Sequence, residues 1–199
     1  SLTFGFTAAT VMQSSSLVNA SKNKLSHMEL YAQMTSSELL TKRDLIFGRA
    51  LHGLNVLIQH YIDLYGGSLC CLLNPNICPE VIDAFESKVS LCYLDHDNFT
   101  SLQYDEVAKI IRNQGSQKHF ILLYNCTYGD SLIDVKRLQS IKAEFSNISI
   151  ILDACLLTAR DYMKFKSHPV FDAVLYSFGY SKFIDINYGG VLTLNNINS

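Results

Sequence analysis

The chain has 199 residues, of which 48% are hydrophobic and 17% charged, so it can bury a sizeable core and is not expected to be disordered. A formal net charge of −2 provides no basic field for nucleic acid, and no apolar run is long enough to cross a bilayer. We therefore expect a globular protein with neither a nucleic-acid nor a membrane partner.

The chain divides by pattern into a lead-in and one domain. Residues 1–34 are rich in Ser, Thr, Asn and Ala with weak periodicity, and we expect an N-terminal arm there. Residues 35–199 form the expected domain. Its first strong element is a helix over 48–65, because apolar residues recur at three- and four-residue steps. Gly66-Gly67 ends this helix, as glycine commonly does after a last turn.

After this helix, short apolar runs alternate with amphipathic segments. The amphipathic segments predict helices at 79–87, 103–113 and 131–145. The apolar runs predict strands at 68–73, 89–94, 120–124, 148–152, 173–176 and 190–194. Strands that are apolar throughout are covered on both faces, which is typical of a parallel sheet between helix layers. The predicted fold class is therefore α/β, a three-layer α/β/α domain with a mostly parallel sheet.

The six cysteines do not predict disulfides or a metal site. Five of them lie in apolar stretches, where free cysteine behaves as a small hydrophobic residue, and no Cys-x-x-Cys pair occurs. The first twenty residues contain no lysine or arginine, so they lack the basic start of a secretory signal. We expect a reducing, cytoplasmic setting and no bound metal.

Three features near strand ends predict a ligand site. Ligands of such sheets gather at the carboxyl ends of the strands, where Asp153 and Ser177 each close a predicted strand. Gly48 opens the first helix, whose backbone N–H groups attract anions. We therefore expect the helix start at Gly48, the Asp153 carboxylate and the Ser177 hydroxyl to lie together at one edge of the sheet.

Asp153, Lys182 and the pair Gly189-Gly190 can each be interpreted either structurally or functionally. Asp153 alone is more often the N-cap of a following helix. Lys182, in a loop rich in small and hydroxyl residues, could be an ordinary surface lysine or a nucleophilic amine. Gly189-Gly190 could be only a turn, or could let backbone approach a ligand where no side chain fits.

The spacing of several short motifs resembles a known family. The motifs are Asp153-Ala154, Asp172-Ala173, Ser177-Phe178, Lys182 and Gly189-Gly190. In this order and at these intervals they resemble the core of the DegT/DnrJ/EryC1 family of fold-type I, pyridoxal phosphate-dependent sugar aminotransferases. Phe47-Gly48-Arg49-Ala50-Leu51 resembles the family's phosphate-binding helix start. The resemblance covers roughly positions 40 to 199.

The resemblance implies a role for each residue. Lys182 would form the Schiff base with pyridoxal phosphate, and Asp153 would keep the ring nitrogen protonated so that the ring acts as an electron sink. Ser177 and the backbone around Gly48 and Arg49 would bind the phosphate. Asp172 is expected to hold the strand turn. The implied reaction moves an amino group from an amino acid to a nucleotide-linked keto sugar, in a homodimer.

The chain also departs from the family pattern. Leu156 stands where the family usually has Gln or His, Tyr188 where it often has Glu, and no aromatic residue is found to stack on the ring. The family's smaller carboxyl-terminal domain is expected to be missing, so the expected domain over 35–199 is an incomplete large domain. Two alternatives stay open: a non-catalytic relative that keeps the fold, and another fold-type I chemistry such as desulfuration or decarboxylation.

Overall fold

A computed structural model of the protein describes residues 43–94, 96–97, 101–127, 133–183, 185 and 187–196. The expected N-terminal arm over 1–34, and its boundary with the domain, lie outside the described residues and stay predictions. The elements that follow all belong to the part of the chain from Arg43 onward.

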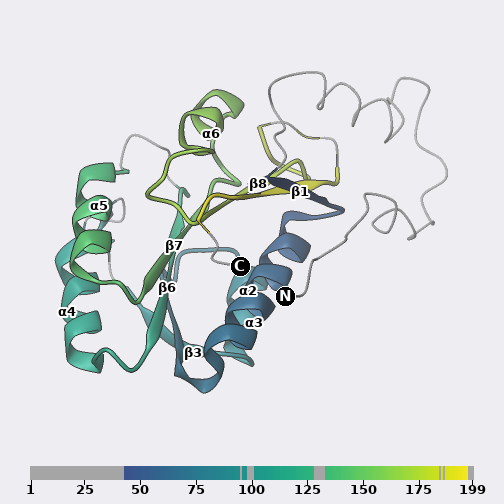
Figure 1. Ribbon diagram of the computed structural model, residues 1–199. Helices are drawn as coiled ribbons and strands as arrows, with labels where there is room; N and C mark the ends of the chain where they lie inside the picture. The colour runs from purple at the N-terminus through teal and green to yellow at the C-terminus, as the bar shows by residue number, and fades with distance from the viewer. Residues whose placement is uncertain are drawn as a thin grey trace, which may run out of the picture. The chain divides into compact units, whose positions relative to one another are not determined.

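The described domain is built on a seven-stranded sheet in the order β1-β9-β8-β7-β6-β2-β3 (Figure 1). The strands are β1 (Asp44–Phe47), β2 (Leu69–Leu73), β3 (Ser90–Tyr93), β6 (His119–Asn125), β7 (Ile148–Asp153), β8 (Ala173–Ser177) and β9 (Gly190–Leu194). From β3 to β8 each pair of neighbours is parallel, whereas β9 is antiparallel to both β8 and β1. The predicted mostly parallel sheet is confirmed. The short strands β4 (His96–Asp97) and β5 (Ser101–Leu102) pair separately.

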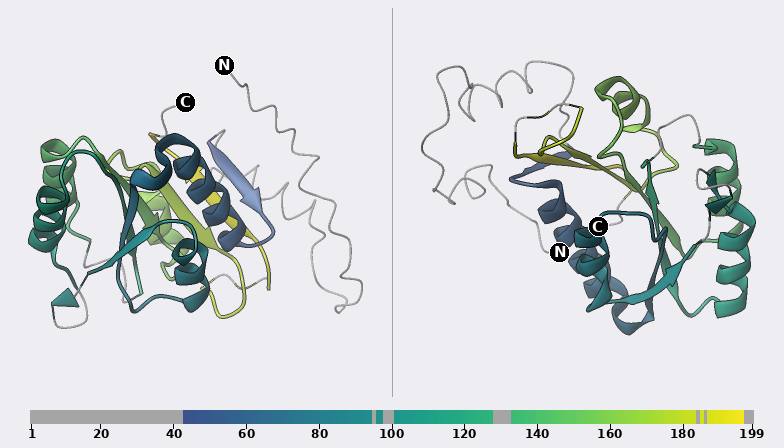
Figure 2. Two further views of the ribbon diagram at one scale, coloured as in Figure 1. Left: turned by 90° about the horizontal axis from the view of Figure 1, so that it is seen from below. Right: turned by 180° about the vertical axis from the view of Figure 1, so that it is seen from behind.

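Helices cover both faces of the sheet, which confirms the predicted three layers (Figure 2). One apolar cluster packs α2 (Ala50–Tyr65) and α3 (Pro79–Glu86) against one face, and the other packs α4 (Tyr104–Gln114), α5 (Val135–Glu144) and α6 (Ala159–Phe165) against the opposite face. Successive residues of a strand point to alternate faces. In β2, Cys70 and Leu72 face the α4 side, while Cys71 and Leu73 face the α2 side. This double burial explains why the central strands are apolar throughout.

The boundaries of the predicted elements differ from the structure at several places. Helix α2 begins at Ala50 and not at Gly48, because Arg49 has an extended backbone and is the N-cap. Helix α5 begins at Val135, where the side chain of Asp134 caps it by accepting from the Arg137 N–H, and not at residue 131. Strands β1, β4 and β5 and helix α6 were not predicted, since each is too short to show a period.

All six cysteines are free, as the apolar setting of five of them predicts. In the described part of the chain, no helix combines the length and the hydropathy that a bilayer crossing requires. The short helix η2 (Gly66–Ser68) follows α2, so the helix ends at the predicted glycine pair, with Gly66 as its C-cap.

Candidate active site

The two predicted strand-end residues lie on one edge and one face of the sheet. Asp153 ends β7 and Ser177 ends the parallel neighbour β8. Ile151 and Leu175, two positions earlier on each strand, both pack under α2 and α3. Because side chains two apart share a face, Asp153 and Ser177 also project toward the α2 side. Strand alternation thus brings the acid and the hydroxyl together as predicted.

The backbone N–H groups at the start of α2 are not engaged by a capping side chain of the described residues, and the first turn of the helix contains no acidic residue. The first N–H groups of a helix have no partner within the helix and favour anions. Gly48 lies before the N-cap, and its carbonyl accepts a 2.7 Å hydrogen bond from the Gly189 N–H. The backbone donors therefore come from Ala50 onward, two residues later than predicted.

Gly190 joins the start of α2 to the end of β8. In the sheet it pairs with Ser177 on one side and Phe47 on the other. A Cβ at this position would lie 2.5 Å from the Cα of Ala50 and 2.8 Å from the carbonyl carbon of Arg49. Only glycine leaves room for this contact. The glycine pair thus admits the backbone of α2, and Ser177 is brought close to the helix start.

Lys182 lies in the loop between β8 and β9, half-buried. Two residues of this loop, Ser181 (φ 62°) and Asn187 (φ 66°), adopt the left-handed conformation that is uncommon for residues other than glycine. The carboxylate of Asp185 accepts from the backbone N–H groups of both, at 3.1 Å and 2.8 Å. Asp185 therefore holds the loop that carries Lys182. Sequence reasoning missed it, because Asp185 stands between Ile184 and Ile186 and no local pattern of turn residues marks it.

Asp153 and Lys182 act on the same neighbour, Cys155. Burial raises the pKa of the Cys155 thiol well above its usual value, the Asp153 carboxylate raises it further, and the Lys182 ammonium opposes the rise. Asp153 is fixed by a 3.0 Å hydrogen bond from the Cys155 N–H to its Oδ1. The helix-cap interpretation of Asp153 is wrong, since the next helix, α6, is capped by Thr158.

Ser177 is buried, and its hydroxyl already has one partner. Its Oγ accepts a 3.2 Å hydrogen bond from the Gly179 N–H. A hydroxyl carries one proton as well as its lone pairs, so Ser177 can still donate to a ligand. Leu156, at the position where the resembling family has a polar residue, exposes 36% of its surface.

A polar cluster at the ends of β2 and β6 was not predicted. Asn125, which pairs with Asp153 in the sheet, donates from Nδ2 to Thr127 Oγ1 at 2.5 Å and to the carbonyl oxygen of Asn76 at 3.5 Å. The N–H of Asn76 in turn donates to Asn74 Oδ1 at 2.8 Å. The signal that identified Asp153, a polar residue that closes a buried strand, would also have found Asn74 and Asn125.

Comparisons of the sequence with known proteins give no match, neither to a family model nor to a curated protein. Comparison of the structure with solved structures does give matches. The PseC aminotransferase of Helicobacter pylori, involved in pseudoaminic acid biosynthesis, aligns with 78% of this chain at 18% identity and a TM-score of 0.65. A Streptococcus pneumoniae protein assigned as a sugar aminotransferase, solved in its pyridoxal phosphate form, aligns with 79% at 12% identity and a TM-score of 0.62.

A third similar structure is 3-amino-5-hydroxybenzoic acid synthase, which aligns with 77% of the chain at 15% identity and a TM-score of 0.60. The chain spans only 38%, 41% and 42% of the length of these three proteins. At such identities the likeness is one of fold. The chain therefore has the fold of part of these three proteins, and the mostly parallel α/β fold that the resemblance implies is confirmed.

Proposed function

We propose that the chain is the cofactor-binding part of a pyridoxal phosphate-dependent aminotransferase. One observation carries the proposal: Asp153, Ser177 and the uncapped start of α2 lie along one edge of the sheet. The charges of Asp153 and Lys182, which both act on Cys155, agree with it. Two similar structures support it. The Streptococcus pneumoniae protein is assigned as a sugar aminotransferase and was solved in its pyridoxal phosphate form, and PseC is an aminotransferase involved in pseudoaminic acid biosynthesis.

The residues fit the chemistry of the group. A phosphate needs N–H and O–H donors, which the start of α2 and the Ser177 hydroxyl provide. A protonated pyridine nitrogen needs a carboxylate, and Asp153 lies half-buried on the same face. The aldehyde needs an amine, and no carboxylate of the described residues pairs with the half-buried Lys182. Gly48 and Arg49 would help to bind the phosphate as part of the loop that leads into α2.

Each residue would then perform one task. When bound, pyridoxal phosphate supplies an electron sink for the bond that breaks at the substrate carbon. Lys182 would bind the group covalently through Nζ and afterwards move a proton with that same atom. Asp153 would hold a proton on the ring nitrogen. Asp185 would keep Lys182 in place through its two backbone hydrogen bonds.

We further propose an amino acid as donor and a nucleotide-linked keto sugar as acceptor. The proposal extends to a homodimer, because Tyr180 and Phe183, on either side of Lys182, expose 79% and 67% of their surface. Large exposed aromatic side chains are common at subunit contacts. Six free cysteines suit a cytoplasmic protein.

The test is cofactor binding by the purified protein. Wild type with added pyridoxal phosphate should develop a visible absorption band, and borohydride should fix the cofactor on the peptide that contains Lys182. Lys182→Ala should lose both, whereas Lys136→Ala, at an exposed position on α5, should keep both. A wild-type protein with no band and no labelled peptide would refute the enzyme and support the non-catalytic relative.

A second measurement separates an aminotransferase from other fold-type I chemistries. Addition of an amino donor to the loaded protein should bleach the visible band with formation of the matching keto acid. Release of sulfide or carbon dioxide instead would assign the fold to desulfuration or decarboxylation. A loaded protein that no amino acid bleaches would bind the cofactor without turnover.

A further inference from the structure

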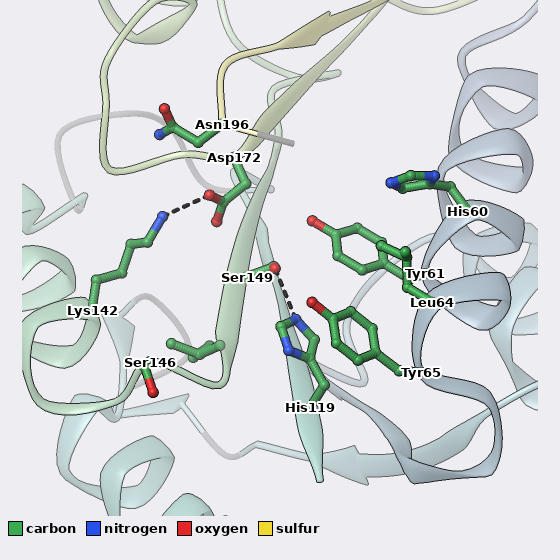
Figure 3. A pocket seen from close by; sticks show the side chains of 11 residues that line it. His60, Tyr61, Leu64, Tyr65, His119, Lys142, Ser146, Ser149, Asp172 and Asn196 are labelled. Carbon is green, nitrogen blue, oxygen red and sulfur yellow. Dashed lines mark hydrogen bonds and ion pairs between the residues drawn. The ribbon is translucent and has the colours of Figure 1, made fainter. Parts of the chain in front are cut away.

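A cavity of about 270 Å³ lies at the other end of the sheet from the candidate active site. Its wall is formed by the second half of α2, by the first residues of β6 and β7, and by Asp172 just before β8 (Figure 3). The amino ends of these parallel strands face this cavity, whereas Asp153 and Ser177 lie at the carboxyl ends. The motif residue Asp172 thus lies here, away from the proposed cofactor, as expected.

Three side chains form a hydrogen-bonded row along the cavity. His119 Nε2 lies 2.9 Å from Ser149 Oγ, and Ser149 hydrogen-bonds Tyr61. Burial lowers the pKa of His119 to about 4, so the ring is neutral at neutral pH. Burial raises the pKa of Tyr61, and the Ser149 hydrogen bond opposes the rise, which is the effect of a donor to the tyrosine oxygen.

The row can keep one proton for a ligand. When His119 carries its proton on Nε2, His119, Ser149 and Tyr61 bring three protons to two hydrogen bonds. With Ser149 donating to Tyr61, the remaining proton is that of the Tyr61 hydroxyl. In Figure 3 the rings of Tyr61 and His60 extend from α2 toward the cavity.

Two further donors border the same cavity. The Lys142 amine donates to Asp172 Oδ1 at 2.7 Å and has two more protons, while Asp172 Oδ2 already accepts from the Ile150 N–H at 2.7 Å. His60 Nε2 is buried and has no hydrogen-bond partner among the described residues. A buried polar atom without a partner is uncommon in a folded protein. The cavity therefore offers hydrogen-bond donors to a ligand, while the carboxylate of Asp172 already accepts from Lys142 and from the Ile150 N–H.

Charge and size restrict what could bind. The charges of Lys142 and Asp172 balance, so any anion in the cavity is repelled by the Asp172 carboxylate, and this repulsion is smaller for one negative charge than for the higher charge of phosphate. Leu64 and Ile148 give the wall an apolar part, and the rings of Tyr65 and His119 stack at 3.8 Å. A cavity of about 150 Å³ holds benzene. This cavity is larger, so it has room for a ring that carries one small polar group.

We propose that the cavity binds a small monocarboxylate with an apolar body. The carboxylate accepts from Lys142 and Tyr61, with His60 as a further donor, and the body lies against Leu64 and Ile148. This site is independent of the pyridoxal phosphate proposal, because it shares no residue with the opposite edge of the sheet.

The experiment uses benzoate as the probe, followed by ligand-observed NMR. Wild type should bind benzoate with a Kd of about 10 mM or tighter, the range expected of a ligand of this size. Benzamide, which has the same shape without the charge, and inorganic phosphate should both bind at least about tenfold more weakly. Benzoate binding that is absent, or matched by either compound, would overturn the proposal.

Variants locate the binding. Tyr61→Phe and Lys142→Gln should each weaken benzoate about tenfold, the effect of one hydrogen bond to a charged group. Tyr93→Phe, on the edge strand β3, and Lys136→Gln, on the exposed side of α5, are matched controls outside the cavity and should bind as wild type does. Thermal unfolding without ligand confirms that each variant is folded. Equal binding by all four folded variants would place the probe elsewhere and refute the site.

Discussion

Gly190 and Ala50 lie in direct backbone contact, so that a Cβ on residue 190 would come within 2.5 Å of the Cα of Ala50. The two residues belong to elements at opposite ends of the described chain, β9 and α2. Their contact fixes where the first turn of α2 lies relative to Ser177, the partner of Gly190 in the sheet.

Replacement of this glycine should move the helix start. We expect Gly190→Ala to destabilise the protein by about 2–3 kcal/mol, because the added methyl group overlaps backbone that cannot rotate away. It should also weaken pyridoxal phosphate binding. Gly67→Ala is the matched control, since a Cβ there would meet nothing within 4 Å. Urea unfolding and cofactor titration check both effects, and an unchanged midpoint in Gly190→Ala would contradict the contact.

A buried ion pair ties β1 to the segment after α6. Lys166 Nζ lies 2.6 Å from Asp44 Oδ2, with the two side chains 2% and 1% exposed. Lys166→Met should cost about 3–5 kcal/mol, because it leaves a buried carboxylate without its cation. The double variant Lys166→Met/Asp44→Leu should recover part of that loss, which the free energies of unfolding of a double-mutant cycle would measure. Additive losses would mean that the pair is not coupled.

The stability of the protein should fall in mild acid because of His119. Its pKa is about 4 in the folded state against 6.5 for the free side chain, so the unfolded state takes up the proton first as the pH falls. The contribution of His119 is therefore complete above pH 6.5 and is lost between 6.5 and about 4, up to about 3 kcal/mol. His119→Gln should flatten the stability profile over this window. His52→Gln, at an exposed position on α2, should leave the slope as it is.

The cysteines should differ widely in reactivity. Cys78 is exposed at the start of α3, whereas Cys70 and Cys71 are buried in β2. Burial raises the pKa of the Cys70 thiol to about 12 and that of Cys71 well above its usual value, which leaves almost no thiolate to react. Iodoacetamide followed by peptide mapping should therefore label Cys78 first. Early labelling of Cys70 or Cys71 would show that β2 opens readily.

Much of the sheet could be predicted because a strand that is buried on both faces is apolar at nearly every position. In β2, β6, β7 and β8 nearly every residue is buried, so apolar runs, interrupted only by Ser149 in β7, identified all four. Strand β1 has four half-exposed or exposed residues at the sheet edge, and no pattern that short distinguishes it from a loop. Helix α6 has seven residues, which is too few for its period to appear.

The candidate site was predictable where it depends on strand ends and not where it depends on contacts between distant segments. Asp153 and Ser177 follow from their positions after buried runs. The start of α2 was placed two residues early, because the glycine of Gly48-Arg49 resembles a helix opening while the backbone of Arg49 is still extended. The cavity near His119 is lined by residues from α2 through to Asn196, just after β9. These residues are far apart in the sequence, so no local pattern predicts the cavity.

The position of β1 has a consequence for the order in which the protein folds. Among the strands of the described residues, β1 pairs with β9 alone, and the hydrogen bond from Thr193 Oγ1 to Asp44 Oδ1 spans 149 residues of sequence. At typical synthesis rates the ribosome makes β1 and α2 roughly 7 to 30 s before β9 emerges. We therefore expect the amides of β1 to gain protection last during refolding, after the parallel strands have assembled. The start of α2, which we propose binds the phosphate, is then the first part of the candidate site to be made and the last to be fixed in place.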